Sequence, residues 1–195
     1  MKYDKRYLRK ISLLERKKNY LKTKKFNFNL IFKLIKKHFS KRKIIIAGYY
    51  PSNYEVNILN FLQNATKKKF RIVLPVIRSS GKMSFKSWIF KEPLYVSTFG
   101  TLEPKNSNRA IIPDLIMVPL VAYDSQLNRI GYGKGYYDRV LKQLSAKKKI
   151  LAIGIAYSFQ ECSSIPTNRF DYKLDCILTD KNLIYDKNNE NFIFR

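Results

Sequence analysis

The chain has 195 residues, of which 45% are hydrophobic and 14% aromatic, which suffices for one sizeable core and excludes a disordered or collagen-like chain. The formal net charge is +25, and Met1–Lys43 alone carries 17 basic residues and a net charge of +15. Such a charge would attract nucleic acid, nucleotide phosphates or a polyglutamate tail. The sequence is also rich in Lys, Asn, Ile, Phe and Tyr, the residues of A/T-rich codons, so much of the charge can instead reflect genome composition.

Neither a membrane segment nor a zinc or disulfide framework fits the sequence. No uncharged apolar run approaches the roughly 18 to 20 residues of a spanning helix, and the charges of Met1–Ser12 exclude a signal peptide. Cys162 and Cys176 lack CxxC spacing and His38 is the single histidine, so we expect two small, buried cysteines. We expect a cytoplasmic protein with one domain over residues 1–195 and no membrane partner.

Periodicity predicts two amphipathic helices before the first strand, over Tyr3–Lys18 and Phe26–Phe39. Both carry apolar residues three and four positions apart among many lysines and arginines. Together they form a basic helical N-terminal segment, about residues 1–42.

Beyond this segment, strand and helix patterns alternate. The predicted elements, in chain order, are a strand over Lys43–Ala47, a helix over Val56–Ala65, a strand over Arg71–Leu74 stopped by Pro75, a hairpin or edge strand over Lys82–Phe90, a loop over Gly100–Arg109, a strand over Leu115–Val118 ending at Pro119, a helix over Tyr136–Leu144, and strands over Ile150–Ala156 and Cys176–Leu178. Because strand–helix–strand units form parallel crossovers, the sequence predicts an α/β fold, a three-layer αβα sandwich around a mainly parallel sheet. The sequence from Lys181 onward shows no pattern that predicts an element.

The glycine-rich segment Gly131–Arg139 reads Gly-Tyr-Gly-Lys-Gly-Tyr-Tyr-Asp-Arg and lies between a predicted strand and a predicted helix. Open α/β sheets bind ligands at that position. Its glycines would let backbone amides approach a phosphate, the helix N-terminus adds uncovered N–H groups, and Lys134 supplies a cation. The segment lacks the Gly-Lys-Ser/Thr ending of a Walker loop, so the glycines alone are weak evidence of nucleotide binding.

Asp138 lies in the first turn of the helix that follows. Tyr137, Val140 and Leu141 share the stripe that faces the core, so Asp138 lies on another face, toward the phosphate end. A carboxylate beside phosphates suggests Mg²⁺. The same residue also fits a role limited to complementing the helix dipole, which the pattern alone favours.

Taken together, the motifs resemble the 5-formyltetrahydrofolate cyclo-ligase family, also called methenyltetrahydrofolate synthetases. The resemblance covers about Lys5 to Thr179, and its specific part is the strand with Pro119, Ala122 and Asp124 followed by Arg129 and the glycine-rich segment. The shorter matches are Lys5-Arg6-Tyr7-Leu8-Arg9, Tyr50-Pro51 with Glu55, Leu74-Pro75, Met83-Ser84-Phe85, Phe99-Gly100 with Glu103-Pro104, Gln160, Pro166, Asp171 and Leu174-Asp175. The chain departs from the family pattern at Leu120, at Asn128, which tolerates a left-handed turn in place of glycine, and at Phe170.

The resemblance implies ATP- and Mg²⁺-dependent cyclisation of 5-formyltetrahydrofolate, with or without a polyglutamate tail, to 5,10-methenyltetrahydrofolate, with release of ADP and phosphate. The formyl oxygen would be phosphorylated first, and the second nitrogen would then attack the activated carbon. The residues implied are, for ATP, Lys5, Arg6, Tyr7, Leu8, Arg9, Gly131, Tyr132, Gly133, Lys134, Gly135, Tyr136, Tyr137 and Asp138; for the folate, Tyr50, Glu55, Gly133, Lys134, Gly135, Tyr136 and Tyr137; for catalysis, Lys134, Tyr136 and Asp138; and for magnesium, Asp138 and Asp175.

Several of these residues also have a purely structural interpretation. Lys5 and Arg9 fit solvated positions of a lysine-rich helix, Tyr137 fits the core, Glu55 fits a first-turn helix acid, and Asp175 fits a cap at a strand end.

Two other functions remain open from the residues. One is a nucleic-acid-binding module that uses the basic segment and Phe26, Phe28 and Phe32; the other is a different enzyme of the same architecture, such as a sugar-phosphate isomerase or CoA-transferase. The family resemblance favours the cyclo-ligase, and we expect a monomer with no specific nucleic-acid partner.

Overall fold

The computed structural model describes residues 4–23, 26–39, 43–98, 100–105 and 109–186. Some expectations from the sequence fall outside these ranges. They concern residues 1–3, 24–25 and 40–42 of the N-terminal segment, Phe99 of the family motifs, residues 106–108 of the predicted loop, and the tail from 187 on.

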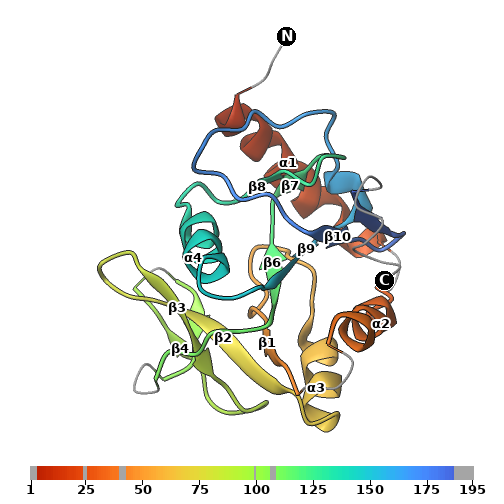
Figure 1. Cartoon of the computed structure of the whole chain (residues 1–195). Coiled ribbons are helices and arrows are strands. Elements are labelled where there is room, and N and C mark those ends of the chain that lie inside the picture. The colour runs from red at the N-terminus through yellow and green to blue at the C-terminus, as the bar shows by residue number, and fades with distance from the viewer. Residues whose placement is uncertain (1–3, 24–25, 40–42, 99, 106–108, 187–195) are drawn as a thin grey trace.

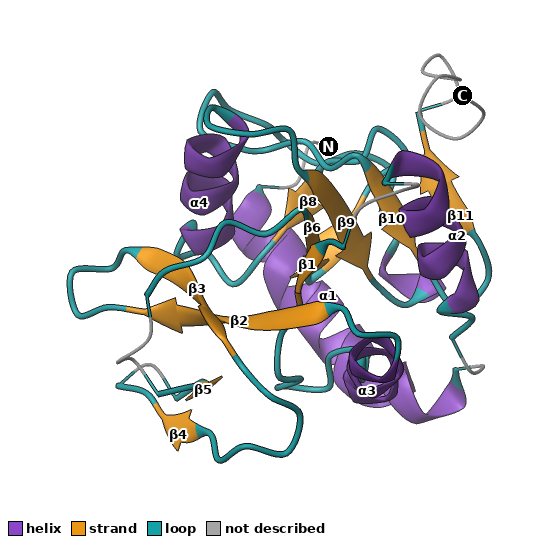
Figure 2. Ribbon diagram, turned by 60° about the horizontal axis from the view of Figure 1, so that its bottom comes forward, coloured by secondary structure: helices purple, strands orange, loops and turns teal. Residues whose placement is uncertain are grey.

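A seven-stranded sheet in the order β11-β10-β9-β6-β1-β2-β3 forms the centre of the molecule (Figures 1 and 2). The strands are β1 (Ile45–Ala47), β2 (Arg71–Ile77), β3 (Met83–Ser87), β6 (Leu115–Pro119), β9 (Leu151–Ile155), β10 (Cys176–Leu178) and β11 (Leu183–Tyr185). The five inner strands run parallel, and β3 and β11 pair antiparallel at the two edges. The predicted α/β class and mainly parallel sheet are confirmed.

Helices cover both faces of this sheet, as Figure 2 shows. On one face lie α2 (Asn29–His38) and α3 (Leu59–Lys67), whose apolar residues join one buried cluster with the strands. On the other lies α4 (Tyr136–Ser145), which buries Val140 and Leu141 in a second cluster. The three-layer arrangement predicted from the sequence is therefore confirmed.

The first helix, α1 (Lys5–Asn19), lies on neither face. It begins at Asp4, whose carboxylate accepts the Tyr7 N–H at 2.7 Å, and a short 3₁₀ turn, η1 (Tyr20–Lys22), follows it. At its start, Leu8 packs on β7 (Ala122–Tyr123) and β8 (Arg129–Ile130), a hairpin beyond the end of β6 (Figure 1). The helix also contacts η2 (Ser158–Gln160). The basic N-terminal segment thus divides between the β7–β8 hairpin and the sheet.

Strand β2 continues to Ile77, although we expected it to stop at Pro75. Because β1 ends at Ala47, the side of β2 that Pro75 faces has lost its strand partner, and the missing N–H costs no ladder hydrogen bond. Two residues on, Ile77 donates its N–H to the Glu103 carboxylate, 3.2 Å from each oxygen.

Short pairings account for the remaining differences from the sequence prediction. The predicted loop over Gly100–Arg109 contains β5 (Leu102–Glu103), which pairs with β4 (Tyr95–Val96). The tail from Lys181 contributes β11, and the β7–β8 hairpin was not anticipated. In its turn, Leu127 rather than Asn128 has a positive φ, of 68°.

The cysteines form no disulfide. Cys176 is buried in β10, as expected, whereas Cys162 is half-buried, and burial raises the pKa of its thiol to about 11. Within the described residues no three His, Cys, Asp or Glu side chains group as metal ligands. None of the helices described is long and apolar enough to cross a membrane.

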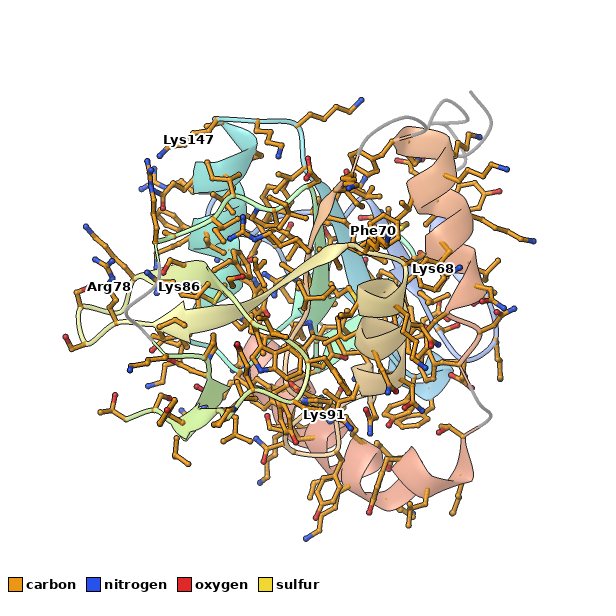
Figure 3. The ribbon with its side chains drawn as sticks, turned by 90° about the horizontal axis from the view of Figure 1, so that it is seen from below. Lys68, Phe70, Arg78, Lys86, Lys91 and Lys147 are labelled. Carbon is orange, nitrogen blue, oxygen red and sulfur yellow. The ribbon has the colours of Figure 1, made fainter. Side chains whose placement is uncertain are left out.

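The basic side chains project from several elements (Figure 3). Lys147 lies beyond α4, Arg78 follows β2 and Lys91 follows β3, and all three are exposed. Lys68, beyond α3, lies 5.4 Å from the centre of the Phe32 ring. The positive charge is therefore spread over the surface and is not confined to the N-terminal helices.

Candidate active site

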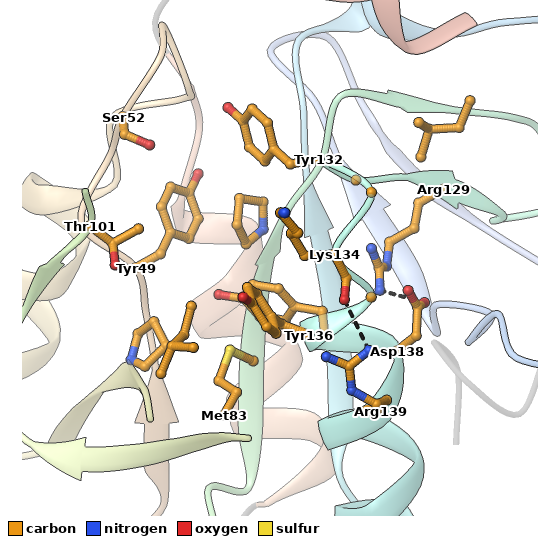
Figure 4. Close-up of a pocket in the computed structure, with 18 of the residues that line it drawn as sticks. Tyr49, Ser52, Met83, Thr101, Arg129, Tyr132, Lys134, Tyr136, Asp138 and Arg139 are labelled. Atoms are coloured by element: carbon orange, nitrogen blue, oxygen red, sulfur yellow. Dashed lines mark hydrogen bonds and ion pairs between the residues drawn. The ribbon is translucent and has the colours of Figure 1, made fainter. Parts of the chain in front are cut away.

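A cavity of about 650 Å³ opens at the carboxyl edge of the parallel strands (Figure 4). Its walls come from the segment that follows β1, from β2, β3 and β5, from the end of β6 and strand β8, from α1, and from the glycine-rich loop at the start of α4. Ligands of open α/β sheets bind at this edge. The position therefore agrees with the place predicted from the glycine-rich segment.

The glycine-rich loop depends on glycine at two positions. Gly133 and Gly135 have φ angles of 95° and 65°, which residues with a side chain rarely adopt. A Cβ at Gly133 would also lie 3.2 Å from Arg9 Cζ, and Arg9 donates its Nε–H to the Gly131 carbonyl at 2.7 Å. The loop thus packs directly against α1 and leads into α4, whose first N–H groups lack partners within the helix.

Lys134 lies at the tip of this loop with an exposed side chain. Its carbonyl accepts a hydrogen bond from Arg139 Nη1 at 2.9 Å, and the Arg139 guanidinium lies 5.4 Å from the centre of the Tyr136 ring. The backbone at Lys134 is therefore fixed, and its ammonium reaches the cavity without an ion pair to any described residue. A helix N-terminus with a nearby cation is suited to binding an anion.

Asp138 forms an ion pair with a buried arginine. Its Oδ1 accepts hydrogen bonds from Arg129 Nη2 at 2.7 Å and from the Tyr172 N–H at 3.2 Å. Burial lowers the pKa of the Arg129 guanidinium, and Asp138 opposes that change. Asp138 thus compensates a buried positive charge, a role that its first-turn position did not indicate, and no described residue bonds to its Oδ2.

The opposite wall carries a second carboxylate, that of Glu55. The turn from Ser52 to Glu55 places Asn53 and Tyr54 at φ angles of 47° and 62°, and such a conformation costs a tyrosine on the order of 1 kcal/mol or more. The Glu55 Oε2 accepts the Ser52 N–H at 2.9 Å, which holds the turn closed. Burial raises the pKa of Glu55, and the Ser52 hydrogen bond and the charge of Arg16 oppose that rise. Glu55 precedes α3 and is not the first-turn helix acid of the structural interpretation.

The structure brings most of the predicted site residues together. The cavity is lined by Lys5, Arg9, Tyr50, Glu55, Gly131, Tyr132, Gly133, Lys134, Gly135, Tyr136, Tyr137 and Asp138. Arg6 and Tyr7 are exposed outside it, and Leu8 is buried against the hairpin. The structure therefore does not bring these three side chains to the cavity.

Asp175 lies away from the cavity. It immediately precedes β10, and its Oδ2 accepts the Ala152 N–H at 2.7 Å, near the start of β9. Asp175 and the Ala152 N–H both lie at the amino edge of the sheet, whereas the cavity and Asp138 lie at the carboxyl edge. A magnesium site shared by Asp138 and Asp175 is therefore not supported, and Asp175 is the strand-end cap of the alternative interpretation.

Sequence reasoning missed several residues of the site. Tyr49 and Asp171 line the cavity, and Asp171 forms an ion pair of 2.5 Å with Lys5. Arg16 is buried behind the loop; its seven-residue spacing from Arg9 places both on one helix face, a signal that could have identified it.

Tyr137 has a buried hydroxyl with no described hydrogen-bond partner, although its ring lines the cavity. Burial also raises the pKa of this hydroxyl. A buried polar group without a partner is unusual in folded proteins. Tyr137 thus packs against the core, as the structural interpretation has it, and also lines the cavity.

Comparison with known proteins identifies the family of the chain. The model of the 5-formyltetrahydrofolate cyclo-ligase family matches residues 1–180. The 5-formyltetrahydrofolate cyclo-ligase of Mycoplasma genitalium is 35% identical over 185 residues, which cover 90% of this chain and 97% of that protein. That of Haemophilus influenzae is 31% identical over 139 residues, 68% of this chain and 74% of the relative.

Solved structures give the same result. A 5,10-methenyltetrahydrofolate synthetase of Aquifex aeolicus superposes with a TM-score of 0.69 at 30% identity, covering 93% of this chain and 92% of that one. The corresponding protein of Mycoplasma pneumoniae gives a TM-score of 0.68 at 28% identity, covering 91% and 99%. The resemblance found in the sequence is confirmed: the chain belongs to the 5-formyltetrahydrofolate cyclo-ligase family, and this membership indicates an enzyme with 5,10-methenyltetrahydrofolate synthetase activity.

Proposed function

We propose that the chain closes 5-formyltetrahydrofolate to 5,10-methenyltetrahydrofolate with ATP and Mg²⁺, releasing ADP and phosphate. One observation carries the proposal. A single cavity has an anion-binding wall, made of the glycine-rich loop and the start of α4, and a facing wall that bears Tyr50 and Glu55. Such a cavity can hold a nucleotide and a folate against each other.

The anion-binding wall is assigned to the ATP phosphates. Gly133 and Gly135 expose the loop backbone, and Lys134 supplies a positive charge that is free to meet the transferred phosphoryl group. Lys5 and Arg9 add cations from α1 at the same cavity. Positioning and charge neutralisation of this kind account for most of the catalysis of phosphoryl transfer.

Magnesium would enter as part of the nucleotide substrate. Mg²⁺ commonly takes one or two carboxylates together with phosphate oxygens and water. Asp138 fits this use, because both of its hydrogen bonds end on Oδ1 and its Oδ2 remains available. The ion would draw charge from the transferred phosphoryl group, and Asp138 is the protein ligand that we assign to it.

The facing wall is assigned to the folate. Tyr50 and the Glu55 carboxylate offer a ring surface and an acceptor for N–H groups of the folate ring system. Tyr136 and Tyr137 lie between the two walls, and the unpartnered Tyr137 hydroxyl can donate to a ligand oxygen. Tyr136 would orient the reacting formyl group between the two substrates.

The chemistry needs orientation more than it needs a nucleophilic side chain. The formyl oxygen is a poor leaving group, so it attacks the γ-phosphorus and displaces ADP. The second folate nitrogen then attacks the activated formyl carbon, loses its proton and expels phosphate. Lys134 and the α4 N–H groups would stabilise the charge that develops on the phosphoryl oxygens.

We further propose a cytoplasmic monomer that works as one domain and has no specific nucleic-acid partner. The last part, that nucleic acid is no specific partner, is supported by α1, whose Lys5, Arg9 and Arg16 face the cavity or the loop behind it. These cations therefore contact the cavity and the loop of the same chain and are not all presented to an external partner.

The proposal is tested by the growth of the near-ultraviolet absorbance of the methenyl product. Purified protein receives 5-formyltetrahydrofolate with ATP and Mg²⁺, and parallel reactions omit ATP or Mg²⁺. We expect turnover in the complete reaction alone. Folded protein that gives no product with all components present, or product without ATP, overturns the proposal.

A further inference from the structure

Arg16 is the most deeply buried charged side chain described in α1, with 1% of its surface exposed. Its Nη1 donates to the Leu120 carbonyl at 3.1 Å, and its Nη2 donates to the Tyr132 hydroxyl. Leu120 directly follows β6, and Tyr132 belongs to the glycine-rich loop. One guanidinium therefore joins α1 to two segments around the cavity.

The direct partners of this buried cation are neutral. A carbonyl and a hydroxyl satisfy two of its nitrogens, and its Nε has no described partner. Burying a positive charge is costly unless a negative charge lies near. The Glu55 carboxylate supplies that charge from the facing wall, and the Tyr132 hydroxyl, which accepts from Arg16, interacts electrostatically with both charged groups.

We propose that Arg16 is a positioning residue for the folate side of the cavity: it holds Tyr132 in the wall and supplies a buried positive charge to the wall that faces Glu55, the acceptor assigned to N–H groups of the substrate. The inference rests on the proposed function. It extends that function to a residue of α1 that does not line the cavity and that neither the sequence motifs nor the family resemblance singled out.

The surroundings of Glu55 explain why a distant cation matters. Burial acts to protonate Glu55, and the groups that face it are the tyrosines Tyr49 after β1, Tyr132 in the loop, Tyr137 of α4 and Tyr157 after β9, together with Arg16 of α1. Of these, Arg16 alone is positively charged. Its removal therefore raises the pKa of Glu55 further.

The hydrogen bond from Arg16 determines how the Tyr132 hydroxyl can use its own proton. A phenol has one proton, so a Tyr132 hydroxyl that accepts from Arg16 keeps its own proton to donate to an acceptor on the cavity side. The Arg16 guanidinium carbon also lies 5.5 Å from the centre of the Tyr132 ring. Loss of Arg16 thus frees both the hydroxyl and the ring of Tyr132, although the residue keeps its place in the chain.

The test compares Arg16→Met, Arg16→Lys and Tyr132→Phe with Lys17→Met, which removes the same charge from an exposed neighbouring position of α1. For each variant KM for the folate and for ATP are measured across pH 5 to 8. In Arg16→Met we expect KM for the folate to rise about tenfold, with KM for ATP within about twofold. The acidic limb of kcat/KM for the folate should move to higher pH.

The other variants separate charge from packing. Arg16→Lys keeps the cation and should keep the acidic limb at its wild-type pH, whereas Tyr132→Phe should raise KM for the folate about threefold through loss of the hydroxyl. Lys17→Met should match the wild type. An unmoved limb in folded Arg16→Met, or the same shift in Lys17→Met, overturns the proposal.

Two further readouts keep the test decisive. If Arg16→Met does not fold, Tyr132→Phe decides, and an unchanged folate KM in that variant overturns the proposal. Calorimetric binding of 5-formyltetrahydrofolate without ATP compares the same variants independently of turnover. A wild type that binds folate without turning it over contradicts the proposed function, while the binding comparison still tests Arg16.

Discussion

The two edges of the sheet use the same residue type in opposite ways. At the amino edge, Asp114 and Asp175 each precede a strand and cap an amide of a neighbouring strand, with bonds of 2.8 Å to Ile45 N–H and 2.7 Å to Ala152 N–H. At the carboxyl edge, Asp138 bonds to a buried arginine and lines the cavity. Asp114 and Asp175 thus hold strands together, whereas Asp138 holds part of the site.

The comparison shows that strand polarity is a better guide to function than residue type. Parallel strands bring all their carboxyl ends to one edge, where the following loops can gather side chains around a ligand. A carboxylate just before a strand lies at the other edge and is drawn to free strand amides. The difference is open to experiment through variants placed in pairs at the two edges.

The largest effect is expected from Asp138→Asn. The change removes the counter-charge of Arg129 and the carboxylate assigned to Mg²⁺ while keeping the side-chain shape. We expect kcat/KM to fall about 100-fold, equivalent to about 2.7 kcal/mol, with partial recovery at raised Mg²⁺. Steady-state kinetics over a magnesium series measures both.

The matched control is Asp175→Asn at the amino edge. Asparagine can still accept the Ala152 N–H, so activity should stay within about twofold and thermal unfolding should shift only slightly. Equal losses of activity in the two variants would contradict the division between the edges. A magnesium response unchanged from the wild type in Asp138→Asn would contradict the metal assignment.

A somewhat smaller loss is expected from Lys134→Ala. The ammonium is assigned to the ATP phosphates, so its removal should lower kcat/KM for ATP about 30-fold, on the order of 2 kcal/mol. Folate affinity should change little. The control is Lys147→Ala, an exposed lysine beyond the other end of α4 (Figure 3), which should leave both constants unchanged. Parallel losses for both substrates in Lys134→Ala would show that it serves the loop and not the phosphates.

Gly133→Ala should have a moderate effect that separates strain from crowding. The positive φ of 95° costs alanine about 1 kcal/mol, and its Cβ would meet the Arg9 guanidinium at 3.2 Å. Gly81 has a similar φ of 74° with nothing within 4 Å, so Gly81→Ala bears the strain alone. Both variants should lose stability in thermal melts, and only Gly133→Ala should raise KM for ATP. A normal KM in Gly133→Ala would mean that contact between Arg9 and the loop is unimportant.

The periodicity of apolar residues predicted individual strands and helices, because it depends on residues that are close together in the sequence. Ile44 and Ile46 of the first strand run are buried and Ile45 is half-buried, and Val140, Leu141 and Leu144 of α4 are buried, because strand and helix periodicity reflects burial. The prediction that the strand stops at Pro75 was wrong, because the effect of a proline on a strand depends on where the neighbouring strand ends. Only the assembled sheet shows that position.

The candidate site was predictable to the extent that it is contiguous in sequence. Gly131–Asp138 lines the cavity as one segment, and the family motifs added Lys5, Arg9 and Glu55. What the sequence could not supply were contacts between distant segments. The pairing of Arg129 with Asp138, and the position of Asp175 at the far edge, follow from the tertiary structure.

The smallest effect concerns the exposed charge, which both edges share. Lys147 and Lys149 are exposed at the amino edge and Lys134 and Arg139 at the carboxyl edge, and further cations project elsewhere (Figure 3). If this charge is compositional, nucleic acid should bind weakly near physiological salt, with a steep salt slope and no sequence preference. Sequence-selective binding that survives such salt would support a nucleic-acid module instead.

The cations at the two edges should differ in their effect on a substrate with a polyglutamate tail, because only the cations near the cavity can contact that tail. We expect a lower KM for the polyglutamylated substrate than for the monoglutamate at low ionic strength, and the preference should fade with added salt. Lys147→Glu should weaken nucleic-acid binding slightly and leave this preference intact, since the residue lies beyond the far end of α4. Comparison of KM at two ionic strengths measures the preference. If Lys147→Glu abolished it, the tail would run over the surface near α4's far end, and the charge at the two edges would not be functionally distinct.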